Sequence, residues 1–219
     1  LHRSLRRQRQ MCIRDSRYPG ARCDTESHAY TYFFSEEIFQ EWEWSERYPG
    51  HAEIRKYLNY VSNKYSLNKD IQLDTEVISA TYNEKNNLWI LKTKNDETFT
   101  TKFLITAVGC ISTTNIPNIK GLNKFEGEYY HTGNWPKNDV DFSGKKVGQI
   151  GTGSTGIQAA PVIAEKAKHL TVFQRTPNFS VPARNNTLTK DFKKYVKNNY
   201  NELKSLVKET PNGHAFRIS

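Results

Sequence analysis

The sequence predicts an α/β fold built around a Rossmann-type dinucleotide-binding unit. Residues 145–176 contain a short apolar strand (147–150), an Ala-rich helix and a second apolar strand (170–173). The turn between the first strand and the helix carries G-x-G-x-x-G, formed by Gly151, Gly153 and Gly156. A strand–turn–helix–strand context makes this pattern typical of dinucleotide binding rather than of a structural turn.

Each glycine of this turn has a physical role. Gly151 permits the tight turn, Gly153 lets the backbone approach a pyrophosphate, and Gly156 lets the helix and strand pack closely. The free N–H groups and the positive dipole end of the helix then face the phosphates.

The end of the second strand indicates NADP rather than NAD. An NAD site usually carries Asp or Glu about 20 residues after the turn. Here the strand ends in Gln174, Arg175 and Thr176, with no carboxylate. A guanidinium would pair with a 2′-phosphate in bidentate geometry. The alternative is a solvated arginine at a strand end; the upstream motif favours NADP.

Upstream of this unit we expect two helices and then a small sheet. Ser35 can cap a helix that begins at Glu36, and a second helix begins near His51. Strand candidates at residues 71–81, 88–93 and 98–106 are joined by polar turns, which predicts an antiparallel meander. The last strand continues as an apolar run to Gly109, suited either to a close cofactor ring or to a buried core strand.

Two further segments complete the chain. Residues 112–144 lack periodicity and are interrupted by Pro and Gly, which indicates a connection between domains. After residue 182, Thr189 can cap a Lys-rich helix. We expect one face of that helix to carry Phe192, Tyr195, Val196, Leu203 and Leu206.

Composition excludes several classes of protein. The longest apolar stretch of the 219 residues is too short to cross a membrane. Cys12, Cys23 and Cys110 are widely spaced, so neither a disulfide framework nor a structural zinc site is expected, and the chain suits the reducing cytoplasm. Of the net charge of +9, much comes from five arginines in residues 1–16. We interpret that run as a non-native leader rather than a nucleic-acid-binding arm.

The connection also contains a specific fingerprint, F-x-G-x-x-x-H-x-x-x-W-P, formed by Phe125, Gly127, His131, Trp135 and Pro136. It is similar to that of the Baeyer–Villiger monooxygenases. Residues 17–24, 40–44, 142–145 and 173–177 resemble the same family, so the resemblance covers essentially residues 17–219. Flavin monooxygenases that hydroxylate amines or sulfides are the alternative, but they generally lack the Trp-Pro ending.

The resemblance implies a flavoprotein with two dinucleotide-binding domains, for FAD and NADP(H). Residues 17–111 would belong to the FAD-binding domain, 112–144 to the connection, 145–183 to the NADP-binding unit and 184–219 to the start of a helical insertion. In such enzymes NADPH reduces the flavin, which takes up O₂ as a C4a-peroxyflavin. That peroxide attacks a ketone and gives an ester or lactone.

The same resemblance implies roles for individual residues. Arg22, Cys23 and Asp24 would form a loop that meets NADP, with Asp24 also near the flavin. Tyr30 and Val77 would contact the flavin, and His131 would couple the domains as a hinge element. The NADP cradle would comprise Gly151, Thr152, Gly153, Ser154, Thr155, Gly156, Ile157, Gln158, Arg175 and Thr176.

Two departures from the family pattern predict an internal fragment. No G-x-G-x-x-G for FAD precedes Arg17, and the active-site arginine of the family would lie beyond Ser219. We therefore expect Asp24 and His131 to have supporting roles only, and the chain alone to be an inactive NADP-binding fragment. No metal, membrane or nucleic-acid partner is expected, and the oligomeric state stays open.

Overall fold

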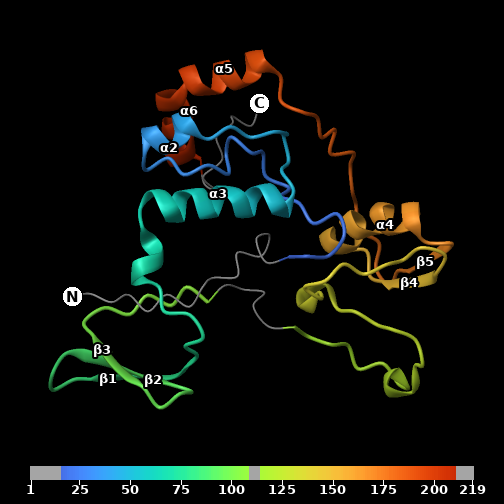
Figure 1. Cartoon of the computed structure of the whole chain (residues 1–219), viewed down its shortest axis with the longest axis horizontal. Helices are drawn as coiled ribbons and strands as arrows, with labels where there is room; N and C mark the ends of the chain where they lie inside the picture. Colours follow the sequence, from blue (N-terminus) through green and yellow to red (C-terminus); the bar gives the residue numbers. More distant parts are fainter. Residues whose placement is uncertain (1–15, 109–113, 211–219) are drawn as a thin grey trace. The chain divides into compact units, whose positions relative to one another are not determined.

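The computed structural model describes residues 16–108 and 114–210, which divide into two units (Figure 1). One unit comprises residues 59–108, and the other comprises 16–58 together with 114–210. Residues 1–15 of the expected leader, which include Cys12, fall outside the described residues, as do Cys110 and the end of the apolar run at Gly109. The domain boundaries expected from the resemblance stay predictions.

The smaller unit is an antiparallel meander, as the sequence predicts. Strands β1 (Val77–Asn83), β2 (Leu88–Thr93) and β3 (Thr98–Thr101) pair in the order β1-β2-β3. A short 3-10 helix, η1 (Leu67–Asp70), precedes them. The bounds of β2 match the prediction, whereas β1 begins later and β3 ends earlier than expected.

Both differences have physical reasons. Asp74 lies in the left-handed region with φ of 51°, which interrupts an extended strand before β1. Pairing of β3 ends at Thr101 opposite Trp89, one residue after β2 begins. The apolar residues that follow therefore have no partner strand on β2, and Ile105 is 86% exposed.

In the larger unit, residues 146–173 form the predicted dinucleotide-binding unit. Strand β4 (Lys146–Ile150), helix α4 (Ser154–Lys166) and strand β5 (His169–Phe173) follow one another, and β4 pairs with β5 in parallel (Figure 1). Beneath them lies a cluster of buried side chains from α4, the 18–21 loop and the connection. Its members are Tyr18, Ala21, Phe142, Ala159 and Ile163.

Helices form the other part of the larger unit. They are α2 (Glu36–Glu41), α3 (His51–Lys64, whose last six residues belong to the smaller unit), α5 (Lys190–Asn198) and α6 (Tyr200–Glu209). As predicted, Ser35 caps α2 and Thr189 caps α5, each accepting a backbone N–H bond (3.4 and 3.2 Å). Helices α2, α5 and α6 share a core of Phe39, Val196, Tyr200, Leu203 and Leu206.

The prediction of one continuous Lys-rich helix is wrong. The structure has two helices that meet at Asn199, whose φ and ψ are −108° and 27°. The Asn199 backbone N–H and side chain both donate to the Tyr195 carbonyl, at 3.1 and 2.7 Å, and this local side-chain bond accompanies the non-helical conformation of Asn199. Tyr195, expected on the buried face, is 52% exposed.

The described part of the connection, residues 114–144, contains only two short 3-10 helices, η2 (Leu122–Lys124) and η3 (Thr132–Asn134). Among the residues described, no helix is long and apolar enough to cross a bilayer. Within residues 16–108 and 114–210, no three His, Cys, Asp or Glu side chains gather as metal ligands would.

Candidate dinucleotide site

The glycine turn has the geometry that its pattern predicts. Gly151 has φ of +103°, a conformation that side chains rarely adopt. A Cβ on Gly156 would lie 2.4 Å from the Gly151 carbonyl oxygen, so only glycine fits there. At Gly153 no atom lies within 4 Å of an added Cβ, which leaves open space for a ligand beside the backbone.

The start of α4 is suited to an anion. Its N-cap is Gly153, no side chain caps it, and its first turn holds no acidic residue. The first N–H groups of a helix have no intrahelical acceptor, and the helix dipole places partial positive charge there. These groups are therefore available to bind a diphosphate.

The carbonyl groups of the turn are bonded by carboxamides that the sequence analysis did not single out. Gln149 Nε2 donates to the carbonyl oxygens of Gly151 and Gly156, at 3.0 Å each. Gln174 Nε2 donates to Thr152 Oγ1, and Asn178 Nδ2 donates to the Thr152 carbonyl, also at 3.0 Å. The sequence does carry a signal for these bonds: Gln149 precedes the turn, and Gln174 and Asn178 follow the second strand.

The N-terminal loop packs onto the first turns of α4. Tyr18 donates its hydroxyl proton to Gln158 Oε1 at 2.8 Å, and Gln158 Nε2 donates to the Arg22 carbonyl at 3.1 Å. Gly20 has φ of +77°, and a Cβ there would lie 2.2 Å from the Gln158 carbonyl oxygen. The structure thus brings the predicted Arg22–Asp24 loop to the predicted cradle. The amide of Gln158 is engaged by the protein itself.

The three residues of that loop differ in their surroundings. Arg22 Nη1 donates to the Tyr48 carbonyl at 3.0 Å and lies 3.4 Å from Glu46 Oε2, which also accepts from Asn185 at 2.5 Å. Cys23 is buried, and burial raises the pKa of its thiol. Asp24 is exposed. Arg22 is therefore held in place and Asp24 is open to a ligand.

Arg175 and Thr176 follow β5 and are exposed. No carboxylate of the described residues pairs with Arg175. Gln174 and Asn178, on either side of them, bind the glycine turn. A guanidinium without an internal counter-charge beside a helix N-terminus suits a phosphate.

The two predicted flavin contacts lie in different units. Tyr30 is half-buried in the larger unit, and Val77 is the first residue of β1 in the smaller one. Their contact with a flavin stays a prediction.

The fingerprint residues of the connection lie around two short turns. Gly127 leaves space for the Phe125 ring, because a Cβ would lie 2.6 Å from the ring. His131 Nδ1 accepts from the Gly133 N–H at 3.1 Å, so it caps η3. Trp135 packs against the buried cluster beneath α4, 6.2 Å from the Phe142 ring, and Pro136 is half-buried. Trp135 therefore attaches the fingerprint to the dinucleotide unit, while the hinge role of His131 stays a prediction.

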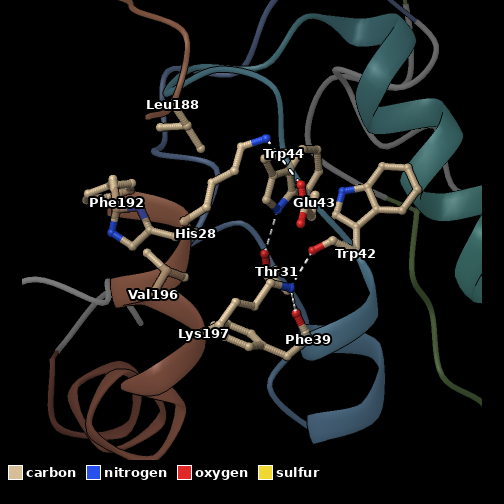
Figure 2. A pocket seen from close by; sticks show the side chains of 11 residues that line it. His28, Thr31, Phe39, Trp42, Glu43, Trp44, Leu188, Phe192, Val196 and Lys197 are labelled. Carbon is tan, nitrogen blue, oxygen red and sulfur yellow. Dashed lines mark hydrogen bonds and ion pairs between the residues drawn. The ribbon is translucent and has the colours of Figure 1, made fainter. Parts of the chain in front are cut away.

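A small hollow lies between α2 and α5 (Figure 2). Its volume of about 30 Å³ accommodates water but not a nucleotide. Lys197 crosses it and donates to the carbonyls of Phe39 and Trp42, at 2.5 Å for Trp42. His28 lies at its edge, where burial lowers the pKa of the imidazole. The glycine turn remains the candidate dinucleotide site, and its residues stay predictions.

Comparison with known proteins identifies the family of the chain. The chain belongs to the pyridine nucleotide-disulphide oxidoreductase family, which it matches over residues 25–215. It is 48% identical to cyclohexanone 1,2-monooxygenase from Acinetobacter over 85% of the chain and 34% of that protein. It is 44% identical to a phenazine N-monooxygenase from Lysobacter antibioticus over 86% of the chain and 35% of that protein.

A solved structure, that of OTEMO in complex with FAD and NADP, is 41% identical. It has a TM-score of 0.86, and the match covers 92% of this chain and 39% of that one. The predicted fold class and the resemblance to Baeyer–Villiger monooxygenases are confirmed. The chain spans a little over a third of the length of the proteins that it matches.

Proposed function

We propose that this protein is an FAD- and NADPH-dependent Baeyer–Villiger monooxygenase that uses O₂ to convert a ketone into an ester or lactone. The observation that carries the proposal is the uncapped glycine turn, joined in one packed unit to the Arg22 loop and the Trp135 fingerprint. The similarity to a cyclohexanone monooxygenase supports the ketone as substrate. The wide spacing of the cysteines supports a cytoplasmic location.

In this proposal the chain's own residues bind and orient the cofactors. N–H groups at the start of α4 bind the diphosphate of NADP, and Arg175 pairs with its 2′-phosphate. Glu46 orients Arg22, and the open carboxylate of Asp24 faces the cofactors. Tyr30 and Val77 contact FAD, and His131 couples the two nucleotide sites. When bound, the flavin supplies oxygen activation and NADPH supplies the reducing equivalents.

Cofactor preference tests the nucleotide part of the proposal. Titration calorimetry on the full-length protein should show tighter binding of NADP⁺ than of NAD⁺. Arg175→Ala should weaken NADP⁺ binding by about 10- to 100-fold, as loss of a charge-assisted contact predicts, and leave NAD⁺ binding unchanged. Equal wild-type affinity for the two nucleotides would overturn the assignment.

Product analysis tests the reaction. The flavin-loaded full-length enzyme, supplied with NADPH, ¹⁸O₂ and cyclohexanone, should give a lactone that carries one ¹⁸O atom by mass spectrometry. NADPH oxidation without any labelled ester or lactone, across a panel of cyclic and linear ketones, would contradict the proposal.

N-oxidation is the second candidate, because one relative is a phenazine N-monooxygenase. The same ¹⁸O₂ assay distinguishes N-oxidation from ketone oxidation when it is run separately with a ketone and with an aromatic amine or phenazine. Faster formation of a labelled N-oxide than of a labelled lactone would assign the second function.

A further inference from the structure

Thr152, the second residue of the glycine turn, receives hydrogen bonds from both ends of the loop that carries Arg175. Gln174 Nε2 donates to Thr152 Oγ1, and Asn178 Nδ2 donates to the Thr152 carbonyl, each at 3.0 Å. These partners lie 22 and 26 residues from Thr152 in the sequence. Residues 174–178 have no helix or strand structure and are exposed, so these two bonds tie the loop to the turn.

These two hydrogen bonds affect nucleotide recognition because Arg175 and Thr176 lie between Gln174 and Asn178 in the loop. An exposed arginine on a free loop loses conformational entropy when it binds a ligand. A loop held in place beforehand loses less, which strengthens binding. A bound dinucleotide would contact the start of α4 with its diphosphate and Arg175 with its 2′-phosphate. The bonds from Gln174 and Asn178 to Thr152 therefore set the distance between these two phosphate-binding positions.

Resting on the proposed function, we infer that Gln174 and Asn178 are positioning residues for nucleotide selectivity. They hold the Arg175–Thr176 segment against Thr152, where it meets the 2′-phosphate of a dinucleotide. Neither amide needs to touch the nucleotide for this effect.

Gln149 provides an internal comparison. Its amide bonds Gly151 and Gly156 within the same turn. It has no hydrogen bond to residues 174–178 in the described structure. Loss of Gln149 should therefore disturb the diphosphate position, which phosphorylated and unphosphorylated dinucleotides share. Loss of Asn178 removes one bond to Thr152 and chiefly releases the loop.

The test measures dissociation constants for NADP⁺ and NAD⁺ by titration calorimetry on the full-length protein. Asn178→Ala and Gln174→Leu should each lower the preference for NADP⁺ by about 3- to 10-fold, with NAD⁺ binding within about twofold of the wild type. Asn178→Ser, which shortens the donor's reach, should lower it similarly. Gln149→Leu should weaken both nucleotides by the same factor.

Two controls separate positioning from general damage. Asn201→Ala, at an exposed position on α6, should leave both constants unchanged. In a Thr152→Val background, which lacks the hydroxyl acceptor, Gln174→Leu should lower the preference no further.

An unchanged preference in the Asn178 and Gln174 variants would overturn the inference, as would parallel weakening of both nucleotides. A wild-type protein without preference for NADP⁺ would instead overturn the proposed NADP site itself, so the two failures are distinguishable.

Discussion

The glycines of the turn differ in what an added methyl group would meet. This difference separates packing of the turn from the space left for a ligand. At Gly156 the methyl would clash with the Gly151 carbonyl and crowd Gln149. At Gly153 the space is open, and φ of −65° suits any residue. Packing of the turn and close approach of a ligand therefore depend on different glycines.

Gly156→Ala should lower the free energy of unfolding by about 1–3 kcal/mol, because overpacking must shift the backbone of the turn. Gly153→Ala should leave stability nearly unchanged yet weaken NADP⁺ binding, since the methyl would occupy space beside the diphosphate. Urea denaturation and calorimetry on both variants check the pair. Equal destabilisation by both substitutions would contradict the assignment.

His28 makes stability depend on pH. Burial, and then the charge of Arg47, lower the pKa of this imidazole, while Glu26 at 3.3 Å opposes the change. Lys193, Lys197 and Glu43 also line the neighbouring hollow. A lowered pKa means that the folded state resists a proton which the unfolded state accepts.

The contribution of His28 is thus fully present above about pH 6.5, the value for an unfolded histidine. It is lost as the pH falls from there through the folded pKa. His28→Phe keeps the ring contact with Phe192 and should flatten the decline of unfolding free energy between about pH 7.5 and 5.5. A slope as steep as that of the wild type, measured by urea denaturation, would show that other groups cause the decline; His51, whose pKa burial also lowers, is the first of these.

At the scale of elements, Lys197 joins α5 to the end of α2 (Figure 2). Its ammonium donates to two carbonyls at the C-terminal end of α2, where a helix leaves carbonyls unpaired and favours positive charge. The same group lies 5.4 Å from the centre of the Phe39 ring. One side chain therefore provides much of the polar contact between these helices.

Lys197→Met keeps the apolar stem and removes the donor, so it should lower the free energy of unfolding by about 1–2 kcal/mol. Lys194→Met, at an exposed position on the same helix, should change it by less than about 0.5 kcal/mol. Chemical denaturation of the two variants gives the comparison, and equal effects would contradict a specific role for Lys197.

Elements with local signals could be predicted from the sequence, and those that depend on distant partners could not. The glycine turn and the caps at Ser35 and Thr189 follow from neighbouring residues. The end of β3 depends on where β2 begins, which the residues of β3 alone do not show. The break at Asn199 is an exception, because the Asn199 side chain bonds the Tyr195 carbonyl only four residues away.

In the candidate site too, features with a local sequence signal could be predicted and contacts between distant segments could not. Gly151 to Gly156 and Arg175 carry a recognisable pattern. The contacts of Gln158 with Tyr18 and Arg22 join segments more than 130 residues apart, and no periodicity reports such a contact.

At the scale of the whole molecule, large apolar side chains are exposed in each unit. An example in the smaller unit is Ile105, and an example in the larger unit is Phe179, whose side chain is fully exposed. Exposed apolar patches bind hydrophobic surfaces and dyes.

We expect the 219-residue chain to bind the dye ANS at micromolar concentration. Ile105→Ser and Phe179→Ser should each reduce the fluorescence, and the two reductions should add because the positions share no partner. Dye binding that neither substitution changes would place the apolar surface elsewhere.

The bond between Tyr18 and Gln158 also bears on how the protein is made. The two residues are 140 positions apart. At a translation rate of about 5–20 residues per second, Tyr18 is synthesised roughly 7–28 s before Gln158. During that interval Tyr18 and Ala21 lack the α4 residues that bury them. The nascent chain must therefore keep this loop unassembled, and a chaperone that binds aromatic segments has time to act on it.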